Sequence, residues 1–255
     1  MNFIPKKSII LTLPHLKCSN DQSDTTPHHN CDTIIEKVAN IMSKILLNDK
    51  REIVIFWGDI NRNISDLNRI ESRGTDFDAQ LEAYVETTIK EINNQNIKNS
   101  NNIIYIIDCH SFPSTKTDNE GHFRNIRINN PDVAILMADC LQLDYAEELY
   151  EILKENNISV TKHLGKGNYI IEKYYAYGRQ LTKNNSLAII IPILIEFNED
   201  LSDAKITIIC QCIEKWIVSI DAYLSNNILN GGKNDAYYYK YMKYKKKYID
   251  LKKYT

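Results

Sequence analysis

Short apolar runs alternate with longer segments of helical periodicity along most of the chain. Ser8–Leu13 (SIILTL) and Glu52–Trp57 (EIVIFW) are β-rich runs, and the continuously apolar Asn102–Asp108 (NIIYIID) is typical of a strand buried on both faces. Three further strands are predicted at Pro131–Met137, Ile158–Lys162 and Leu187–Phe197. Apolar residues recur at helical spacing in Asp32–Leu47, Asp76–Asn93, Leu143–Asn156 and Ser202–Leu224.

This alternation of strands and helices predicts the fold class. Successive strand–helix units place helices on both faces of a mainly parallel or mixed sheet. We therefore expect an α/β fold of three layers. The 255 residues, of which 43% are hydrophobic and 25% are charged, can bury a core of the size that such a domain needs.

Composition also bears on the compartment. The longest apolar run, Ser186–Ile195, is far shorter than the stretch of about 20 residues that spans a bilayer. The N-terminal segment lacks the small-residue cleavage site of a secretory signal. The six cysteines include no Cys-x-x-Cys pair, so we expect reduced thiols and not disulfides. A cytoplasmic protein with no membrane partner is the resulting prediction.

The C-terminal segment differs from the rest in composition. Lys233–Thr255 holds eight Lys and two Asp, a charge of +6, so the remainder of a chain whose total is −2 carries −8. Seven Tyr are interleaved with these lysines. Such a segment suits nucleic-acid binding, by phosphate neutralisation and base stacking, and it also suits a Lys-rich helix lying on the domain or in solvent. Residues 226–255 are therefore predicted as a linker and a basic tail.

Three residues suited to metal binding or acid–base chemistry stand at predicted strand ends. His15 directly follows the first strand, His110 follows the third within Asp-Cys-His, and Glu196 ends the late strand. Ligands gather at the carboxyl ends of strands in open α/β sheets, and two imidazoles with a carboxylate are usual ligands of a catalytic zinc. Taken singly, each residue also has a structural explanation. Because the chain has no HExxH, HxxEH or nucleophile-elbow motif, spacing leads only to the hypothesis of a metal hydrolase.

The sequence motifs around these residues resemble those of a known protein family. Pro14-His15, INRNISDLNR at 60–69, DCHSFP at 108–113, NPDVAIL at 130–136 and ILIEFNEDL at 193–201 occur in that order. Together they resemble the N-formylglutamate amidohydrolase family over Ile9 to Leu224. The resemblance implies a zinc carboxypeptidase-related, phosphorylase/hydrolase-like α/β fold. It makes residues 1–225 a catalytic domain that cleaves the amide of an N-acyl amino acid such as N-formylglutamate.

The resemblance also assigns a metal site. His15, Asp32 and His110 match ligands of one divalent metal ion, with zinc expected. Glu196 matches the family's late-strand Glu and would be the general base that takes a proton from metal-bound water. The alternatives to Asp32 are Cys18, which stands three residues after His15, and one of the adjacent His28 and His29.

Further matches concern the substrate. Arg62 is assigned to catalysis, and Asn68 and Arg69 of the DLNR block to substrate binding. Asn168 lies in the segment 165–169, which stands where the family has a Gly-rich block, and is also assigned to substrate binding. Arginine suits both capture of a substrate carboxylate and stabilisation of an oxyanion, and the sequence does not divide these tasks. Asp66 would orient an arginine or a ligand imidazole, and an ordinary ion pair explains it equally well.

The resemblance implies a metal-dependent amidohydrolase whose partner is a small N-acyl amino acid. A zinc carboxypeptidase-like peptidase is the alternative among enzymes, and a noncatalytic binding or virion protein that keeps the fold is the alternative outside them. The tail resembles those of many giant-virus proteins, which favours a tag or sorting element. Such a protein would act in the host cytoplasm or in the virion, with nucleic acid bound only through the tail. The sequence leaves the oligomeric state open.

Overall fold

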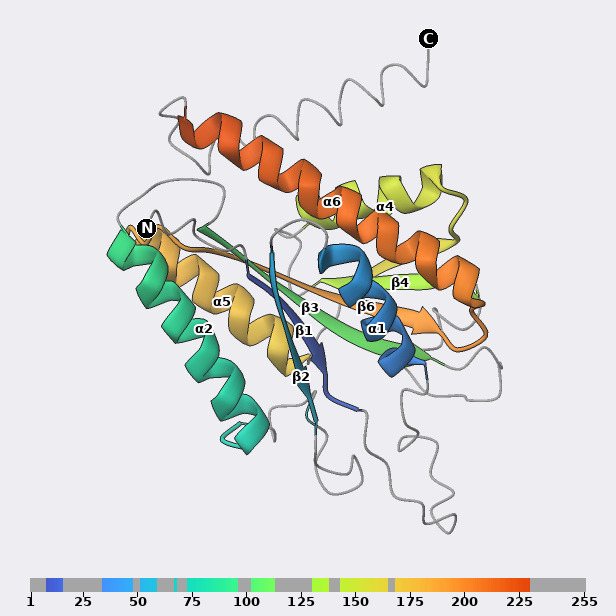
Figure 1. Ribbon diagram of the computed structural model, residues 1–255, viewed down its shortest axis with the longest axis horizontal. Helices are drawn as coiled ribbons and strands as arrows, with labels where there is room; N and C mark the ends of the chain where they lie inside the picture. Colours follow the sequence, from blue (N-terminus) through green and yellow to red (C-terminus); the bar gives the residue numbers. More distant parts are fainter. Residues whose placement is uncertain are drawn as a thin grey trace.

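The computed structural model describes residues 8–15, 34–47, 51–58, 67, 73–95, 102–112, 130–137, 143–164 and 168–229. Within these ranges the chain forms a six-stranded sheet in the order β2-β1-β3-β6-β4-β5 (Figure 1). The strands are β1 (Ser8–Leu13), β2 (Glu52–Trp57), β3 (Ile103–Phe112), β4 (Val133–Met137), β5 (Val160–Leu164) and β6 (Ile189–Asn198). The helices of the described part are α1 (Ile35–Leu46), α2 (Asp76–Gln95), α4 (Leu143–Glu155), α5 (Tyr169–Lys183) and α6 (Asp203–Leu229).

The sheet is mixed. Strands β2, β1, β3 and β6 run parallel to one another, β4 is antiparallel to β6, and β5 is parallel to β4. The carboxyl ends of β1, β3 and β6 therefore meet at one edge, where ligands bind in open α/β sheets.

Helices cover both faces of this sheet, with α2 and α5 on one face and α1, α4 and α6 on the other (Figure 1). Alternate residues of each strand enter the two cores. Ile9, Leu11 and Leu13 of β1 pack with α1, α4 and α6, whereas Ile10 packs with α2 and α5. The predicted α/β class, with a mixed sheet between helical layers, is thus confirmed.

A buried polar network ties α6 to the sheet. The Oη of Tyr105 in β3 donates a hydrogen bond to Oδ1 of Asp221 in α6 over 2.9 Å, and Nη2 of Arg51 lies 3.4 Å from Oδ2 of the same carboxylate. The Arg51 and Asp221 side chains are 1% and 6% exposed. Burial, together with the Asp221 carboxylate, raises the pKa of Tyr105 well above its ordinary value. The hydroxyl therefore remains a donor.

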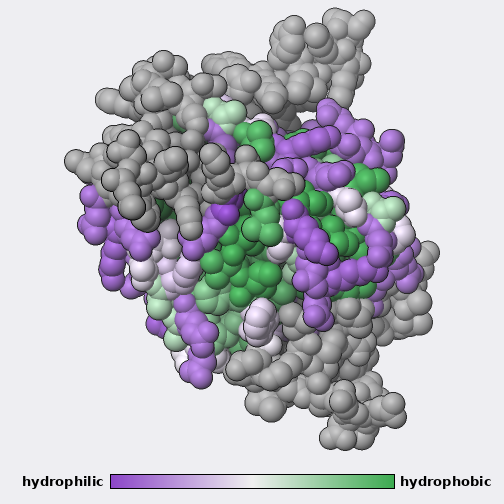
Figure 2. All heavy atoms as spheres, viewed as in Figure 1, coloured by the Kyte–Doolittle hydropathy of each residue, from purple (hydrophilic) through white to green (hydrophobic). Residues whose placement is uncertain are grey.

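Strand β2 forms one edge of the sheet, and its residues are only partly buried. Apolar surface gathers in the middle of the view in Figure 2, over the place where Figure 1 has β2 and α1. Leu47 and Trp57 are 61% and 62% exposed. Within the described ranges, no helix combines the length and the apolarity that crossing a bilayer requires.

Several elements differ from the sequence predictions. Strand β3 was expected to end at Asp108 but runs on to Phe112, because β6 pairs with it as far as Phe112↔Asn198. Helix α5 was not predicted at all. Its buried residues Ile170, Ile171, Tyr174 and Leu181 recur at helical spacing, but Tyr and Gly interrupt the apolar stripe. The predicted helix that began at Ser202 is α6, and it continues to Leu229 instead of ending at Leu224.

Candidate functional site

His15 and His110 meet at the carboxyl edge of the sheet. His15 lies two residues after β1, and His110 lies inside β3, so the expectation that it would follow the strand is wrong. The ring centroids are 5.0 Å apart and the ring planes are inclined by 63°. The two residues are 1% and 3% exposed. Tertiary structure thus brings together two imidazoles that stand 95 positions apart in the chain.

Asp108 contacts the His110 ring through a hydrogen bond. The Nε2 atom of His110 lies 3.1 Å from Oδ2 of Asp108. The hydroxyl of Thr12, which is paired with Asp108 across β1 and β3, donates to Oδ1 over 2.6 Å. Because a carboxylate accepts and does not donate, Nε2 carries the proton in this pair and Nδ1 is the basic nitrogen of the neutral ring. A carboxylate behind a histidine in this way fixes its tautomer and its orientation.

Glu196 completes the cluster from β6. It is paired with His110 in the parallel β3–β6 register and with Ala134 in the antiparallel β4–β6 register. The neighbours Ile195 and Phe197 point into the core beneath α1, α4 and α6, so Glu196 faces the same side of the sheet as His110 and Asp108. Glu196 is 3% exposed. A carboxylate therefore lies beside the histidine pair in a largely dehydrated environment.

Asn168 links the cluster to the start of α5. Its Nδ2 donates to Oδ2 of Asp108 over 3.2 Å, and its Oδ1 accepts the backbone N–H of Ile171 over 2.9 Å. The second bond makes Asn168 the N-cap of α5, a position that Asn favours. The predicted substrate-binding residue is thus engaged in holding Asp108 and the helix start. The partly positive N-terminus of α5 lies next to the cluster.

Gly58 and Thr12 are site residues that the sequence analysis missed. The backbone N–H of Gly58 donates to the Leu13 carbonyl over 2.9 Å. A Cβ on Gly58 would lie only 2.1 Å from the Pro14 carbonyl oxygen and 2.6 Å from Cδ1 of Leu67. Only glycine therefore allows the chain after β2 to approach Pro14, directly before His15. The Gly in Trp57-Gly58, at the end of a predicted strand, was the available signal.

Several predicted residues lie outside the described ranges. These are the third metal ligand Asp32, the catalytic Arg62, the substrate-binding Asn68 and Arg69, the alternatives Cys18, His28 and His29, the residue Asp66, and the tail. Leu67, between Asp66 and Asn68, is described and is fully buried against α2 and α5. Within the described part, no group of three or more His, Cys, Asp or Glu is arranged to hold a metal ion.

Comparison with known proteins identifies the fold. No protein-family model matches the chain, and no curated protein sequence matches it. Among solved structures, the gene product Atu2144 from Agrobacterium tumefaciens is similar with a TM-score of 0.54 at 12% identity, over 86% of this chain and 92% of that chain. This likeness shows a shared α/β fold.

Two further solved structures align with lower TM-scores. An N-formylglutamate amidohydrolase from Ralstonia eutropha JMP134 aligns with a TM-score of 0.49 at 9% identity, over 88% of this chain and 96% of that one. The catalytic domain of the N-acetylmuramoyl-L-alanine amidase CwlV from Bacillus (Paenibacillus) polymyxa var. colistinus aligns with a TM-score of 0.45 at 11% identity, over 84% and 97%.

Proposed function

We propose that the protein is a metal-dependent hydrolase that cleaves the amide bond of an N-acyl amino acid, such as N-formylglutamate. The observation that carries the proposal is the buried approach of His15 to His110, with ring centroids 5.0 Å apart at the carboxyl edge of the sheet. A buried carboxylate, Glu196, is paired with His110 and faces the same side. The DLNR and DCHSFP motifs resemble those of the N-formylglutamate amidohydrolase family, and this resemblance supports the proposed class of substrate.

The described donors fit a zinc ion. Two imidazoles that bind one zinc through nitrogens at about 2 Å have ring centres roughly 5 Å apart. The bond from His110 to Asp108 supplies the outer carboxylate that ligand histidines commonly have. His15 and His110 would hold the metal, and Asp32 is proposed as the third ligand, with Cys18, His28 or His29 as its alternatives. When bound there, a zinc ion would lower the pKa of water to about 7, which makes water a nucleophile at neutral pH.

The protein's own residues then carry the proton. Glu196 takes a proton from the attacking water as the new C–O bond forms, and it passes the proton to the amine nitrogen as the C–N bond breaks. Asn168 and Thr12 hold Asp108, which holds the His110 ring. Arg62 is proposed to stabilise the oxyanion that develops on the acyl oxygen.

Substrate binding is proposed for Arg69 and Asn68. A guanidinium binds a carboxylate with two parallel hydrogen bonds, which suits an acidic amino-acid product. Leu67 immediately precedes these residues and lies against Gly58, next to Pro14. This contact supports placing the DLNR block at the site.

Metal analysis with matched variants tests the proposal. We expect the purified full-length chain to contain about one equivalent of zinc, and His15→Ala and His110→Ala to lose it. His163→Ala is the control, because His163 lies in β5 at the far edge of the sheet. Absence of stoichiometric metal, together with a melting temperature that added zinc does not change, would reject a metalloenzyme.

A substrate panel then separates the reaction classes. N-formylglutamate and N-acetylglutamate are assayed for release of the free amino acid. Dipeptides are assayed in parallel for release of their C-terminal amino acid. Turnover of the N-acyl amino acids that depends on His110 supports the proposal. Turnover of dipeptides alone would replace it with a peptidase. Zinc binding without turnover of any of these substrates would leave a noncatalytic protein of the same fold.

A further inference from the structure

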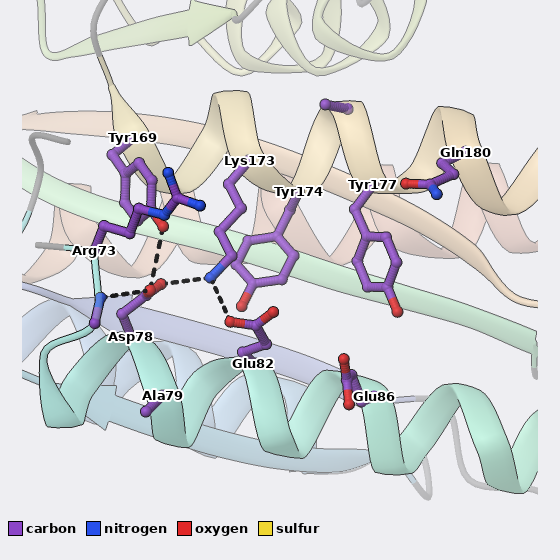
Figure 3. Close-up of a pocket in the computed structure, with 12 residues that line it drawn as sticks. Arg73, Asp78, Ala79, Glu82, Glu86, Tyr169, Lys173, Tyr174, Tyr177 and Gln180 are labelled. Atoms are coloured by element: carbon purple, nitrogen blue, oxygen red, sulfur yellow. Dashed lines mark hydrogen bonds and ion pairs between the residues drawn. The ribbon is translucent and has the colours of Figure 1, made fainter.

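A groove lies between α2 and α5. It has a volume of about 680 Å³. Three carboxylates line it from α2 and three tyrosines line it from α5: Asp78, Glu82 and Glu86, and Tyr169, Tyr174 and Tyr177 (Figure 3). Tyr169 directly follows Asn168, so the groove begins at the N-terminus of α5 and runs along the helix. None of these six residues belongs to the chemistry proposed above.

The carboxylates form a ladder on one side of α2. Asp78, Glu82 and Glu86 are each separated by four residues, so they lie about 6 Å apart along the helix axis. Like charges at this spacing repel one another and destabilise an isolated helix. A cation placed between the helices offsets that repulsion. The ladder therefore favours cationic occupants of the groove.

Lys173 shows how the first two carboxylates of the ladder, Asp78 and Glu82, bind an ammonium group. Its Nζ lies 2.7 Å from Oδ1 of Asp78 and 3.0 Å from Oε2 of Glu82. The same Nζ lies 5.5 Å and 5.6 Å from the ring centroids of Tyr169 and Tyr174. Carboxylates on one side and aromatic rings on the other thus enclose a protonated amine, and both attract it.

The next two carboxylates of the ladder, Glu82 and Glu86, also face tyrosine side chains. Tyr174 and Tyr177 point from α5 toward α2, where Glu82 and Glu86 point back at them (Figure 3). The cation that contacts Glu86 in the described part is Lys90, 3.7 Å away on the same helix. Lys90 does not line the groove, and its side chain is 73% exposed. The pair Glu82 and Glu86 thus has the same groups that bind an ammonium at Asp78, but among the described residues no lysine of the groove contacts Glu86.

The Tyr174 hydroxyl is an independent sign of a ligand. Tyr174 is 1% exposed, and its Oη has no hydrogen-bond partner among the described residues. Burying a hydroxyl without a partner is costly, and the costs are recovered when a ligand supplies one. Burial and the nearby Asp78 and Glu82 raise the pKa of this hydroxyl, so it stays protonated and its lone pairs remain able to accept an N–H.

We propose that this groove binds an elongated organic cation of the diamine or polyamine class. One ammonium group lies between Glu82 and Glu86, donates to Oη of Tyr174 and rests against the ring of Tyr177. The second ammonium lies toward Gln180, which lines the groove beyond Tyr177, because Lys173 already occupies the site between Asp78 and Glu82. Two amines separated by four methylenes lie about 6 Å apart, close to the repeat of the helix. The inference does not depend on the amidohydrolase activity.

Titration calorimetry with spermidine and butane-1,4-diamine on the full-length chain, at low salt, tests this inference. We expect Glu86→Gln to weaken binding about tenfold and Tyr174→Phe to weaken it about threefold to tenfold. The matched controls are Glu36→Gln in α1, on the other face of the sheet, and Tyr175→Phe, on α5 but outside the groove. Both controls should stay within about twofold of the parent chain.

The Tyr174→Phe variant also separates a ligand role from a structural one. Because it removes an unpartnered hydroxyl, we expect its melting temperature to equal or exceed that of the parent while its affinity for spermidine falls. Propylamine, with a single ammonium, should bind more weakly than the diamine. Absence of binding by both amines would show that the groove is no cation site. Equal loss of binding in Glu86→Gln and Glu36→Gln would show that amines bind only as surface counter-ions.

Discussion

Glu196 of β6 and His110 of β3 occupy paired positions on adjacent parallel strands and face the same side of the sheet. The two residues are 3% exposed each, so the carboxylate and the imidazole share a site from which water is largely excluded. Electrostatic interactions are stronger in such a place than in water. The pairing is what makes Glu196 a credible proton acceptor beside the histidine pair.

The Glu196→Gln variant tests that role. The amide keeps the shape of the side chain but does not accept a proton from water, so we expect kcat on N-formylglutamate to fall by about 10²–10⁴-fold. Zinc content should be unchanged, because Glu196 is not a proposed ligand. Steady-state kinetics and metal analysis on one preparation measure both quantities. Activity at the parental level would remove Glu196 from the mechanism.

Asp108→Asn tests the support of the His110 ring. The variant replaces a carboxylate that accepts from Thr12, Asn168 and His110 by a group that holds the imidazole less firmly. We expect zinc affinity to fall about 10- to 100-fold, as measured by competition with a chelator. Asp200→Asn, at an exposed position, is the control and should bind zinc as the parent does.

Gly58→Ala and Gly178→Ala form a matched pair. A Cβ on Gly58 would collide with the Pro14 carbonyl at 2.1 Å, whereas a Cβ on Gly178 meets Ile190 at an ordinary 3.4 Å. We expect Gly58→Ala to lower the free energy of unfolding by about 1–3 kcal/mol and to weaken zinc binding by displacing His15. Gly178→Ala should raise stability by up to about 1 kcal/mol, because glycine is unfavourable inside a helix. Urea denaturation compares the two. Parental stability and zinc affinity in Gly58→Ala would contradict the close approach.

The buried Arg51–Asp221 pair predicts that substitutions at the two positions have non-additive effects on the free energy of unfolding. Asp221→Ala leaves the Arg51 guanidinium and the Tyr105 hydroxyl without this carboxylate, and we expect a loss of about 3–5 kcal/mol. The single change Arg51→Met completes a double-mutant cycle. The double change Arg51→Met with Asp221→Ala removes both charges, so it should cost less than the sum of the two single changes. A double change that costs the sum of the two single changes would show that the two charges do not interact.

Stability should fall in alkaline solution. Burial raises the pKa of the Cys210 thiol from an ordinary 9.0 to about 12, and burial also raises the pKa values of Tyr105 and Tyr174 above 10.0. Between the unfolded and folded pKa values the unfolded chain has released protons that the folded chain keeps. Stability that is fully present below about pH 9 is therefore lost as the pH rises through this window.

Thermal melts at pH 8 and pH 10.5 measure the effect. Cys210→Ala removes one of the three groups and should make the decline in melting temperature less steep. A melting temperature that rises from pH 8 to pH 10.5 would contradict the burial of these protons.

The sequence predicted most of the fold because the core follows local patterns. Strands β1 and β2 have the bounds that their apolar runs predicted, and the helical spacing in Leu143–Asn156 marked α4 to within a residue. Helix α5 was missed because tyrosines and Gly178 interrupt its apolar stripe, and its start depends on Asn168, whose partner Asp108 is 60 positions away. Such a bond leaves no local signal.

By itself, the sequence determined the α/β class, the position of His15 just after the first strand, the position of Glu196 near the end of the late strand, and the family-like motifs around these residues. It placed His110 after a strand that in fact includes this residue. Only the tertiary structure decided that β1, β3 and β6 are neighbours, which brings the two imidazoles to 5.0 Å and pairs Glu196 with His110. Only it revealed Thr12, Asn168 and Gly58 as the supports of the site, and the groove between α2 and α5. The physical reason is that apolar periodicity acts over a few residues, whereas strand order and the contacts of polar side chains depend on residues far apart in the chain.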